Sequence, residues 1–159
     1  AGLTMSTPER LEDRSHGVDL PAAAKSLAAR EAEILADFEM FDDWADRYRY
    51  LIELGEKLPA LADEHKIEAN KVQGCQSQVW LKAERRGAHI VFLADSDSAI
   101  TRGLIALLVR LFSGLTSAEI AGANLTFIER LGFAKHLSMS RANGFAAMIQ
   151  MIKRLAAQP

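Results

Sequence analysis

The spacing of apolar residues changes once along this chain, and that change restricts the fold more than any other feature of the sequence. Over residues 79–84 apolar and polar side chains alternate, and residues 89–94 form a second apolar run after Arg86, Gly87 and Ala88. A two-residue period is typical of a half-buried strand, and a glycine between two such runs indicates a hairpin turn. Lys71 and Val72 are a candidate third strand. All the expected strands therefore lie in one block.

The sequence on both sides of that block has the apolar spacing of amphipathic or buried helices. Before the block we expect helices over residues 22–38 and from about residue 43 to Pro59. After it we expect a core helix over 100–112 with Gly114 as its C-cap, a short helix starting at a Thr116–Glu119 capping box, a helix from Asn124 to Gly132, and a last helix after Ser140. Strands in one block flanked by helices predict an α+β fold, with helices packed on one small antiparallel sheet.

The length of 159 residues is typical of one domain with one core. Residues 1–21 contain many charges and little periodicity, so we expect a flexible N-terminal tail ahead of a single domain over 22–159. Within that tail, residues 1–4 precede Met5 and have the character of a cloning remnant.

The composition excludes several classes of protein. Apolar residues make up 49% and charged residues 25% of the chain, and no apolar run approaches the roughly 20 residues that span a bilayer. The N-terminus has no signal-peptide pattern, and a single cysteine cannot form an internal disulfide, so we expect a cytoplasmic protein. No dense run of Lys and Arg with interleaved aromatic residues indicates nucleic-acid binding.

The net charge of −2 is distributed unevenly. Residues 1–70 hold 8 basic and 16 acidic side chains, whereas residues 71–159 hold 11 basic and 5 acidic ones. One interpretation is that the two halves fold together and compensate each other. The other is a mildly basic face around the cysteine, which favours a thiolate and an acidic partner surface.

The only cysteine, Cys75, lies in a polar stretch that enters the first long strand. Gly74 allows a tight turn or a positive φ, so the thiol can be presented on a loop. Gln76, Ser77 and backbone amides are candidate donors to a sulfur anion. A free thiol with a pKa near about 8.5 is mostly protonated at neutral pH, and such donors or nearby cations would lower that pKa.

Four readings of this cysteine remain open from the residues alone. The first is a sulfur carrier that uses the thiolate as nucleophile. The second is a hydrolase or transferase with His65, His89 or His136 as base. A metal-binding scaffold is the third, although zinc or an iron–sulfur cluster needs more soft ligands than one cysteine supplies. The fourth is an interaction module with an inert, buried cysteine.

Four ordered stretches resemble the sulfur-acceptor proteins SufE and CsdE. Residues 71–81, KVQGCQSQVWL, are similar to the GCQSxVW motif that holds the persulfide-bearing cysteine of that family. The other three stretches are 44–59, with the pattern WxxRYxYLIxLGxxLP, 95–106, with DSDxxIxxGLIA, and 136–144, with HLSxSRxNG. The resemblance covers about residues 22–155. Met139 stands where the family often has proline, and Phe145 where leucine is common.

The resemblance implies an α+β fold shared with the iron–sulfur scaffold protein IscU. It also implies a non-enzymatic sulfur-transfer partner that stimulates a cysteine desulfurase of the SufS or CsdA type and delivers sulfur to a downstream iron–sulfur scaffold or acceptor. The chain itself is then expected to need no cofactor and no metal, since the pyridoxal phosphate belongs to the desulfurase.

Only Cys75 receives a chemical role from the resemblance, that of the nucleophile bearing the persulfide. Arg141 and His136 lie in a matching stretch and are candidate supporting residues. The Arg141 guanidinium would stabilise a thiolate or persulfide. The alternatives are a helix-end arginine for Arg141 and a structural histidine for His136. We further expect the Cys75 side chain to be partly sheltered in the resting protein, with apolar cover from the region of Leu137.

Overall fold

The computed structural model describes residues 25–124 and 126–158. The expected tail over 1–21, the remnant over 1–4 and the expected start of the first helix at residue 22 lie outside the described residues.

A three-stranded antiparallel sheet forms the base of the fold, in the order β1-β2-β3. Strands β1 (Val79–Arg86) and β2 (His89–Ser96) form the expected hairpin, with Val79 paired to Ser96 and Arg86 to His89. Their inward side chains are buried and their outward ones half-exposed, which confirms the two-residue period.

The third strand is not where the sequence indicated. Lys71 makes only an isolated bridge to Trp80, and the strand at the other edge is β3 (Leu115–Thr116), which pairs with β2. Gly114, at φ 91°, turns the chain after the core helix and donates its N–H to the Ile90 carbonyl at 2.6 Å. That turn places the two following residues in register with β2, which no local pattern reveals.

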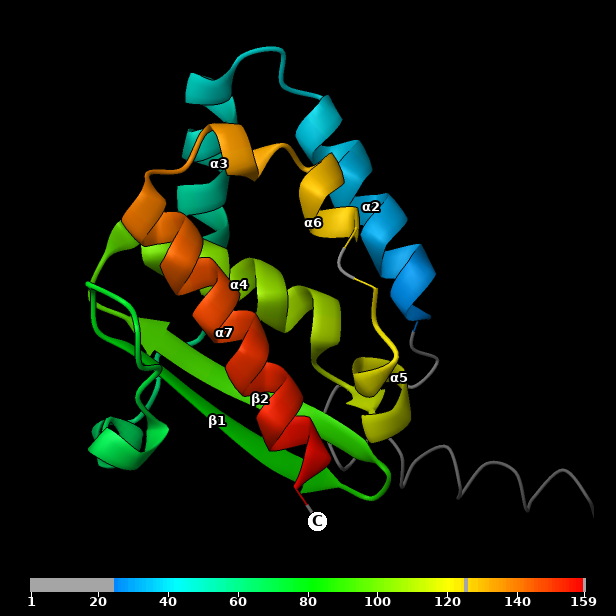
Figure 1. The fold of residues 1–159 in the computed structure, drawn as a ribbon, viewed down its shortest axis with the longest axis vertical. Coiled ribbons are helices and arrows are strands. Elements are labelled where there is room, and N and C mark those ends of the chain that lie inside the picture. Colours follow the sequence, from blue (N-terminus) through cyan, green and yellow to red (C-terminus); the bar gives the residue numbers. More distant parts are fainter. Residues whose placement is uncertain (1–24, 125, 159) are drawn as a thin grey trace, which may run out of the picture.

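Two long helices, α4 (Ala99–Phe112) and α7 (Met139–Ala157), cross the same face of the hairpin (Figure 1). The α4 helix is buried on nearly all sides, as its apolar sequence indicates, and lies between the sheet and the N-terminal helices α2 (Leu27–Glu39) and α3 (Trp44–Lys57). The remaining elements are short: α5 (Ser117–Ala121), α6 (Thr126–Arg130) and the 3₁₀ turns η1 (Asp63–His65), η2 (Glu68–Asn70) and η3 (Phe133–Lys135). Helices packed on one small antiparallel sheet confirm the α+β class. None of the helices in the described part is long and apolar enough to cross a membrane.

The helix starts follow their capping residues. Thr116 and Glu119 form the expected capping box, and the Asn124 side chain accepts from the Thr126 N–H at 2.9 Å. The expected start of the last helix after Ser140 is wrong by a few residues: Ser138 is the N-cap of α7, and its Oγ accepts from the Arg141 N–H at 3.2 Å. The Ser140 hydroxyl instead donates to the Gln76 side chain at 3.2 Å, a contact distant in sequence.

A buried carboxylate fixes the junction between β2 and α4. Asp95 is 6% exposed, and it accepts from the N–H groups of Leu61 and Ser96 at 3.1 and 2.8 Å. Arg102 and Lys66 place their cationic groups 3.3 and 3.6 Å from its oxygens. A buried carboxylate needs such partners, so Asp95 ties the strand, the helix and the segment after α3 together.

Two glycines leave no room for a side chain where α3 crosses α4. A methyl group added to Gly55 would lie 2.8 Å from the Gly103 backbone nitrogen, and one added to Gly103 would overlap the Leu51 carbonyl oxygen. Real side chains do not approach backbone atoms so closely. The two glycines therefore set the separation of these helices.

Replacing Gly103 with alanine should destabilise the fold. The added methyl group forces α3 and α4 apart, and overpacking of this kind costs about 1–3 kcal/mol or more. For a chain of this size each kcal/mol lowers the melting temperature by about 2–4 °C. Urea and thermal unfolding measure the loss.

The matched control is Gly122→Ala, where the new methyl group would lie 3.4 Å from the Ala118 oxygen and the backbone φ is −84°. Equal stability of the Gly103→Ala and Gly122→Ala proteins would contradict the tight helix crossing.

Candidate functional site

Cys75 lies in a short loop that the sheet closes at its base. The Val72 N–H donates to the Val79 carbonyl at 2.8 Å, and the Gln78 N–H donates to the Asp97 side chain at 3.0 Å. Gly74 has φ 93°, a conformation that favours glycine, and it turns the chain so that the next residue faces α7. The loop conformation expected from Gly74 is confirmed.

The sulfur of Cys75 rests on the backbone of α7. Its thiol donates to the Gly144 carbonyl oxygen at an Sγ–O distance of 3.6 Å. A methyl group added to Gly144 would lie 3.2 Å from Sγ and 3.8 Å from Cα and Cβ of Cys75. One added to Gly74 would lie 3.5 Å from Cβ of Ala147. The loop is thus laid flat on the helix, and the cysteine is half-buried, as expected.

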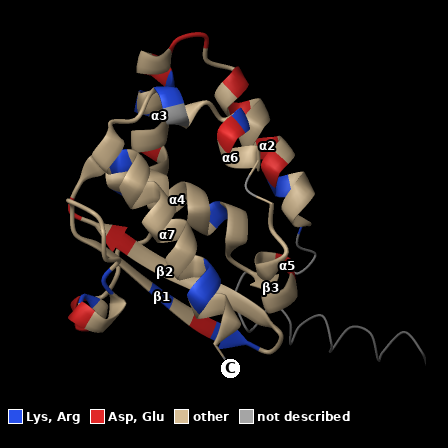
Figure 2. Ribbon diagram, viewed as in Figure 1, with Lys and Arg blue, Asp and Glu red and all other residues tan. Residues whose placement is uncertain are grey.

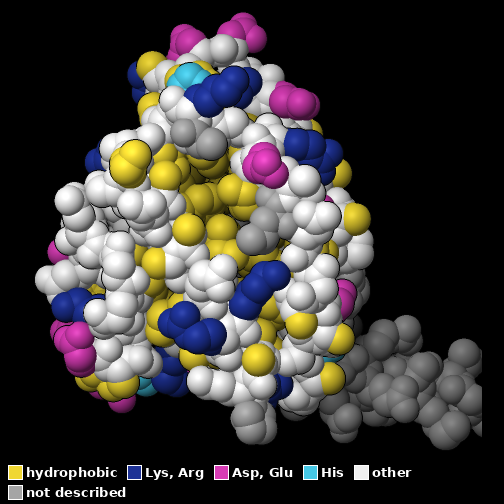
Figure 3. All heavy atoms as spheres, in the orientation of Figure 1, with side chains coloured by type: hydrophobic (Ala, Val, Ile, Leu, Met, Phe, Trp, Pro, Cys, Tyr) yellow, Lys and Arg dark blue, Asp and Glu magenta, His cyan; other side chains and the backbone are white. Residues whose placement is uncertain are grey.

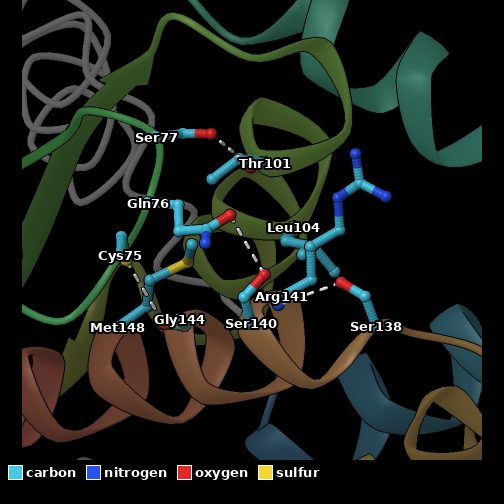
Figure 4. A pocket seen from close by; sticks show the side chains of 10 residues that line it. All are labelled: Cys75, Gln76, Ser77, Thr101, Leu104, Ser138, Ser140, Arg141, Gly144 and Met148. Atoms are coloured by element: carbon cyan, nitrogen blue, oxygen red, sulfur yellow. Dashed lines mark hydrogen bonds between the residues drawn. The ribbon is translucent and has the colours of Figure 1, made fainter.

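A cavity of about 240 Å³ opens beside the sulfur, between the loop, α4 and α7 (Figure 4). Most of its lining side chains are polar or carry hydroxyl groups. The lining residues are Cys75, Gln76, Ser77, Thr101, Leu104, Ser138, Ser140, Arg141, Gly144 and Met148. We call this cavity the Cys75 pocket.

Three of the predicted supporting residues line the Cys75 pocket. Gln76 accepts a hydrogen bond from Ser140, and Ser77 accepts one from Thr101 at 3.5 Å. Arg141 stands across the pocket from Cys75, and Figure 4 shows its guanidinium directed away from the sulfur. The tertiary structure therefore gathers these residues, but it places none of their donors on Sγ among the contacts described.

His136 lies elsewhere. Its ring stacks on the ring of Trp44, with centroids 3.9 Å apart and planes at 14°, and it is not part of the Cys75 pocket. The stack joins the end of η3 to the start of α3. In this conformation His136 has a structural contact and no contact with the cysteine.

The resting site holds the thiol in its protonated form. Burial raises the pKa of the Cys75 thiol above its ordinary value, because a thiolate loses hydration in this half-buried position. The donors that the sequence suggested do not lower this pKa in the resting conformation.

The described residues offer Cys75 neither a base nor a metal. No histidine is among the residues that line the pocket, and His89 instead bonds the Gly114 carbonyl through Nδ1 at 2.8 Å. Within 25–124 and 126–158 no group of three or more His, Cys, Asp or Glu side chains is arranged to hold a metal ion.

The sequence reading missed two contributors to the site, Gly144 and Thr101. Gly144 lies inside a helix, where glycine is unfavourable, and this was a signal of close backbone approach. Thr101 is 6% exposed in the first turn of α4, and its contact with the cysteine loop depends on tertiary packing alone.

A second cavity, of about 340 Å³, lies on the other side of α7, against α6 and η3. Its walls are largely apolar, and Figure 3 shows the apolar side chains gathered in a hollow between these helices. Leu137 lines this second cavity. Leu137 itself is not among the residues that line the Cys75 pocket, although the adjacent Ser138 is, and the contact described for the sulfur is with Gly144.

The raised pKa predicts how alkylation of Cys75 depends on pH. Iodoacetamide reacts with thiolates, so the rate should reach its half-maximum at a higher pH in the folded protein than in an unstructured peptide of residues 71–79. Mass spectrometry of the alkylated protein over a pH series measures both curves. An inflection at or below that of the peptide would contradict the protonated resting state.

The sequence is similar to known proteins over most of its length. The family model described as "SufE: Fe-S metabolism associated domain" matches residues 32–156. An uncharacterised SufE-like protein of Rhizobium etli is 39% identical over 142 residues, covering 86% of this chain and 96% of the relative. An uncharacterised SufE-like protein of Rhizobium meliloti is 43% identical over 126 residues, covering 76% and 90%.

The fold is also found among solved structures. The solution structure of a hypothetical protein from Thermus thermophilus superposes with a TM-score of 0.67 at 16% identity, covering 80% of this chain and 93% of that one. At this identity the likeness concerns the fold alone. The family match, by contrast, spans most of the chain and supports a role in iron–sulfur metabolism. This chain belongs to the SufE family.

Proposed function

We propose that this protein accepts sulfur as a persulfide on Cys75 from a cysteine desulfurase and passes it on for iron–sulfur cluster assembly. The observation that carries the proposal is the placement of the only cysteine. It sits on a loop closed at its base, half-buried beside a pocket, inside the stretch that resembles the family's persulfide motif. A sheltered but movable thiol suits a carrier that must hold reactive sulfur between two partners.

The proposed transfer is a thiol–persulfide exchange. The Cys75 thiolate attacks the outer sulfur of the persulfide on the desulfurase cysteine, forming a new S–S bond to Cys75. The S–S bond of the donor breaks, and its electron pair remains on the desulfurase cysteine as thiolate. The proton of the Cys75 thiol goes to solvent when the loop leaves Gly144, because attack requires the anion.

The proposal assigns the other chemistry to partners. Pyridoxal phosphate would be bound by the desulfurase, which is of the SufS or CsdA type, and this chain would need no cofactor or metal of its own. It would act as a non-enzymatic acceptor and activator. A Cys–His hydrolase is less well supported, because no histidine of the described residues lines the Cys75 pocket.

The surface around the pocket supports a macromolecular donor. Met139, the first residue of α7, is 79% exposed and lies between Ser138 and Ser140, which both line the pocket. A partner that brings its cysteine to Cys75 must cover this residue, because a stable interface buries about 800 Å² on each side.

Charge also distinguishes the helix α7, on which the Cys75 loop rests. The α7 helix carries Arg141, Lys153 and Arg154 and no acidic residue. Figure 2 shows acidic residues instead along α2 and its connection to α3. We therefore expect the docking surface of the desulfurase to be acidic.

Incubation with a SufS-type desulfurase and L-cysteine should add sulfur to Cys75. Intact mass spectrometry should show the mass of at least one extra sulfur atom, which dithiothreitol removes, and Cys75→Ser should gain none because it lacks the nucleophile. Sulfide release by the desulfurase should be faster with the wild type than with Cys75→Ala, and the difference should shrink as salt is added. Equal release with both proteins would show that Cys75 is not the acceptor.

Met139→Glu should weaken docking of the desulfurase. Removing an apolar anchor at the centre of an interface and adding a charge costs about 1–2 kcal/mol, or roughly tenfold in affinity. The measurement is the concentration of this protein that gives half-maximal stimulation of sulfide release.

Met40→Glu is the matched control, since Met40 is 77% exposed at the end of α2 and does not line the Cys75 pocket. Circular dichroism checks that both variants fold. Equal behaviour of the two variants would exclude Met139 from the interface.

A further inference from the structure

Gly144 places a carbonyl oxygen, rather than a side chain, against the sulfur of Cys75. It is buried in the first half of α7, where a methyl group would lie 3.2 Å from Sγ. Alanine favours a helix more than glycine does, so the helix itself gives no reason for glycine here. The contact with Cys75 gives one, because a methyl group at this position would crowd the sulfur where it rests on the helix backbone. We call this contact the Gly144 seat.

The Gly144 seat distinguishes the thiol of Cys75 from its thiolate and its persulfide by whether Sγ carries a proton. A carbonyl oxygen can only accept, and the neutral thiol supplies a proton on Sγ at an Sγ–O distance of 3.6 Å. A thiolate has no proton to donate. In a persulfide the proton, when present, is on the outer sulfur, so Sγ has lost its donor as well.

The seat also distinguishes the persulfide from the thiol by size. The outer sulfur of a persulfide is bonded to Sγ at about 2.05 Å, so it cannot lie between Sγ and the Gly144 oxygen. It must point toward the pocket side, where Ser77 and Ser140 lie, or the loop must lift. In either case the hydrogen bond that holds Cys75 on α7 is absent.

We propose that Gly144 is a positioning residue that holds Cys75 in the seat as the unloaded thiol and releases it once the cysteine carries sulfur. This inference rests on the proposed function of Cys75 as a persulfide carrier. Its consequence is directional: the seat stabilises the unloaded form over the loaded one, which favours delivery of sulfur to the next acceptor. The unloaded carrier is held on α7, and the loaded carrier has lost the hydrogen bond that holds it there.

The experiment compares the shelter of the two forms without a desulfurase. Inorganic disulfide, HSS⁻, loads the protein chemically. The Cys75 thiolate attacks one sulfur of this ion and forms an S–S bond to it, while the S–S bond of the ion breaks and hydrosulfide leaves. Iodoacetamide then reacts with either form, and intact mass separates the products. Each rate is divided by that of the same form of an unstructured peptide of residues 71–79.

The thiol in the wild-type protein should react about tenfold more slowly than the peptide thiol, as expected when one net hydrogen bond and its packing must open. The persulfide should react at nearly the rate of the peptide persulfide. Equal slowing of thiol and persulfide would overturn the inference, because the seat would then hold both forms. This comparison needs no variant and no desulfurase. The seat can therefore be rejected while sulfur transfer to Cys75 is observed, and sulfur transfer can be absent while the seat is supported.

Gly144→Ala supplies the second test. The methyl group displaces the sulfur, so alkylation of the thiol should accelerate toward the peptide rate, its inflection should move to lower pH, and the persulfide rate should stay the same. Asn143→Ala is the control, since Asn143 is an exposed neighbour on the same helix and should change neither rate. Unfolding in urea checks the fold of both variants. An unchanged thiol rate in folded Gly144→Ala would reject the seat.

Discussion

The close crossing of α3 over α4 is the contact on which the rest of this structure depends. Gly55 and Gly103 let the two helix backbones approach to a distance that no side chain permits, and α4 thereby becomes the buried centre of the molecule. The sheet packs on one side of α4 and the N-terminal helices on the other. Asp95 then joins the end of β2 to Arg102 on α4, so the strands are held at a fixed place along the helix. The ends of β1 and β2 that carry the cysteine loop are thus placed by helix packing.

A glycine also allows a close approach to a helix backbone at the site of Cys75. Gly144 lets a loop, rather than a helix, come down onto α7, and the group in contact with the backbone is the thiol of Cys75. Burial raises the pKa of that thiol, so a smaller fraction of the cysteine is thiolate in the resting protein than in an exposed thiol. The proposed carrier would gain from this, because the thiol would act as a nucleophile only after the loop had left α7.

Family membership and site geometry support the proposal from different directions. Membership of the SufE family connects the chain to iron–sulfur metabolism, but the relatives compared here are themselves uncharacterised. The geometry adds what the names do not: a single thiol, a polar pocket beside it, and no histidine or metal cluster around it among the described residues. Together they favour an acceptor of sulfur over a hydrolase or a metal scaffold.

The sequence by itself determined the parts of this protein that depend on local pattern. Alternation over residues 79–94 identified the hairpin, the all-apolar run over 100–112 identified the buried helix, and Gly74 identified the turn that presents Cys75. Capping residues identified the start of α5, because a cap is a contact between residues three apart. These features need no knowledge of distant neighbours.

Tertiary structure decided everything that required two distant segments to meet. Strand β3 exists because the chain returns beside β2 after Gly114, whereas Lys71, a candidate strand residue in the sequence, makes only an isolated bridge to Trp80. Histidine 136 and Arg141 lie in one short stretch, yet His136 stacks on Trp44 while Arg141 lines the Cys75 pocket. The contact of the Cys75 thiol with the Gly144 carbonyl likewise joins residues 69 apart in the sequence. The local sequence specifies that Cys75 is presented on a loop. Tertiary packing determines how far its thiol is buried, and burial raises the pKa of that thiol.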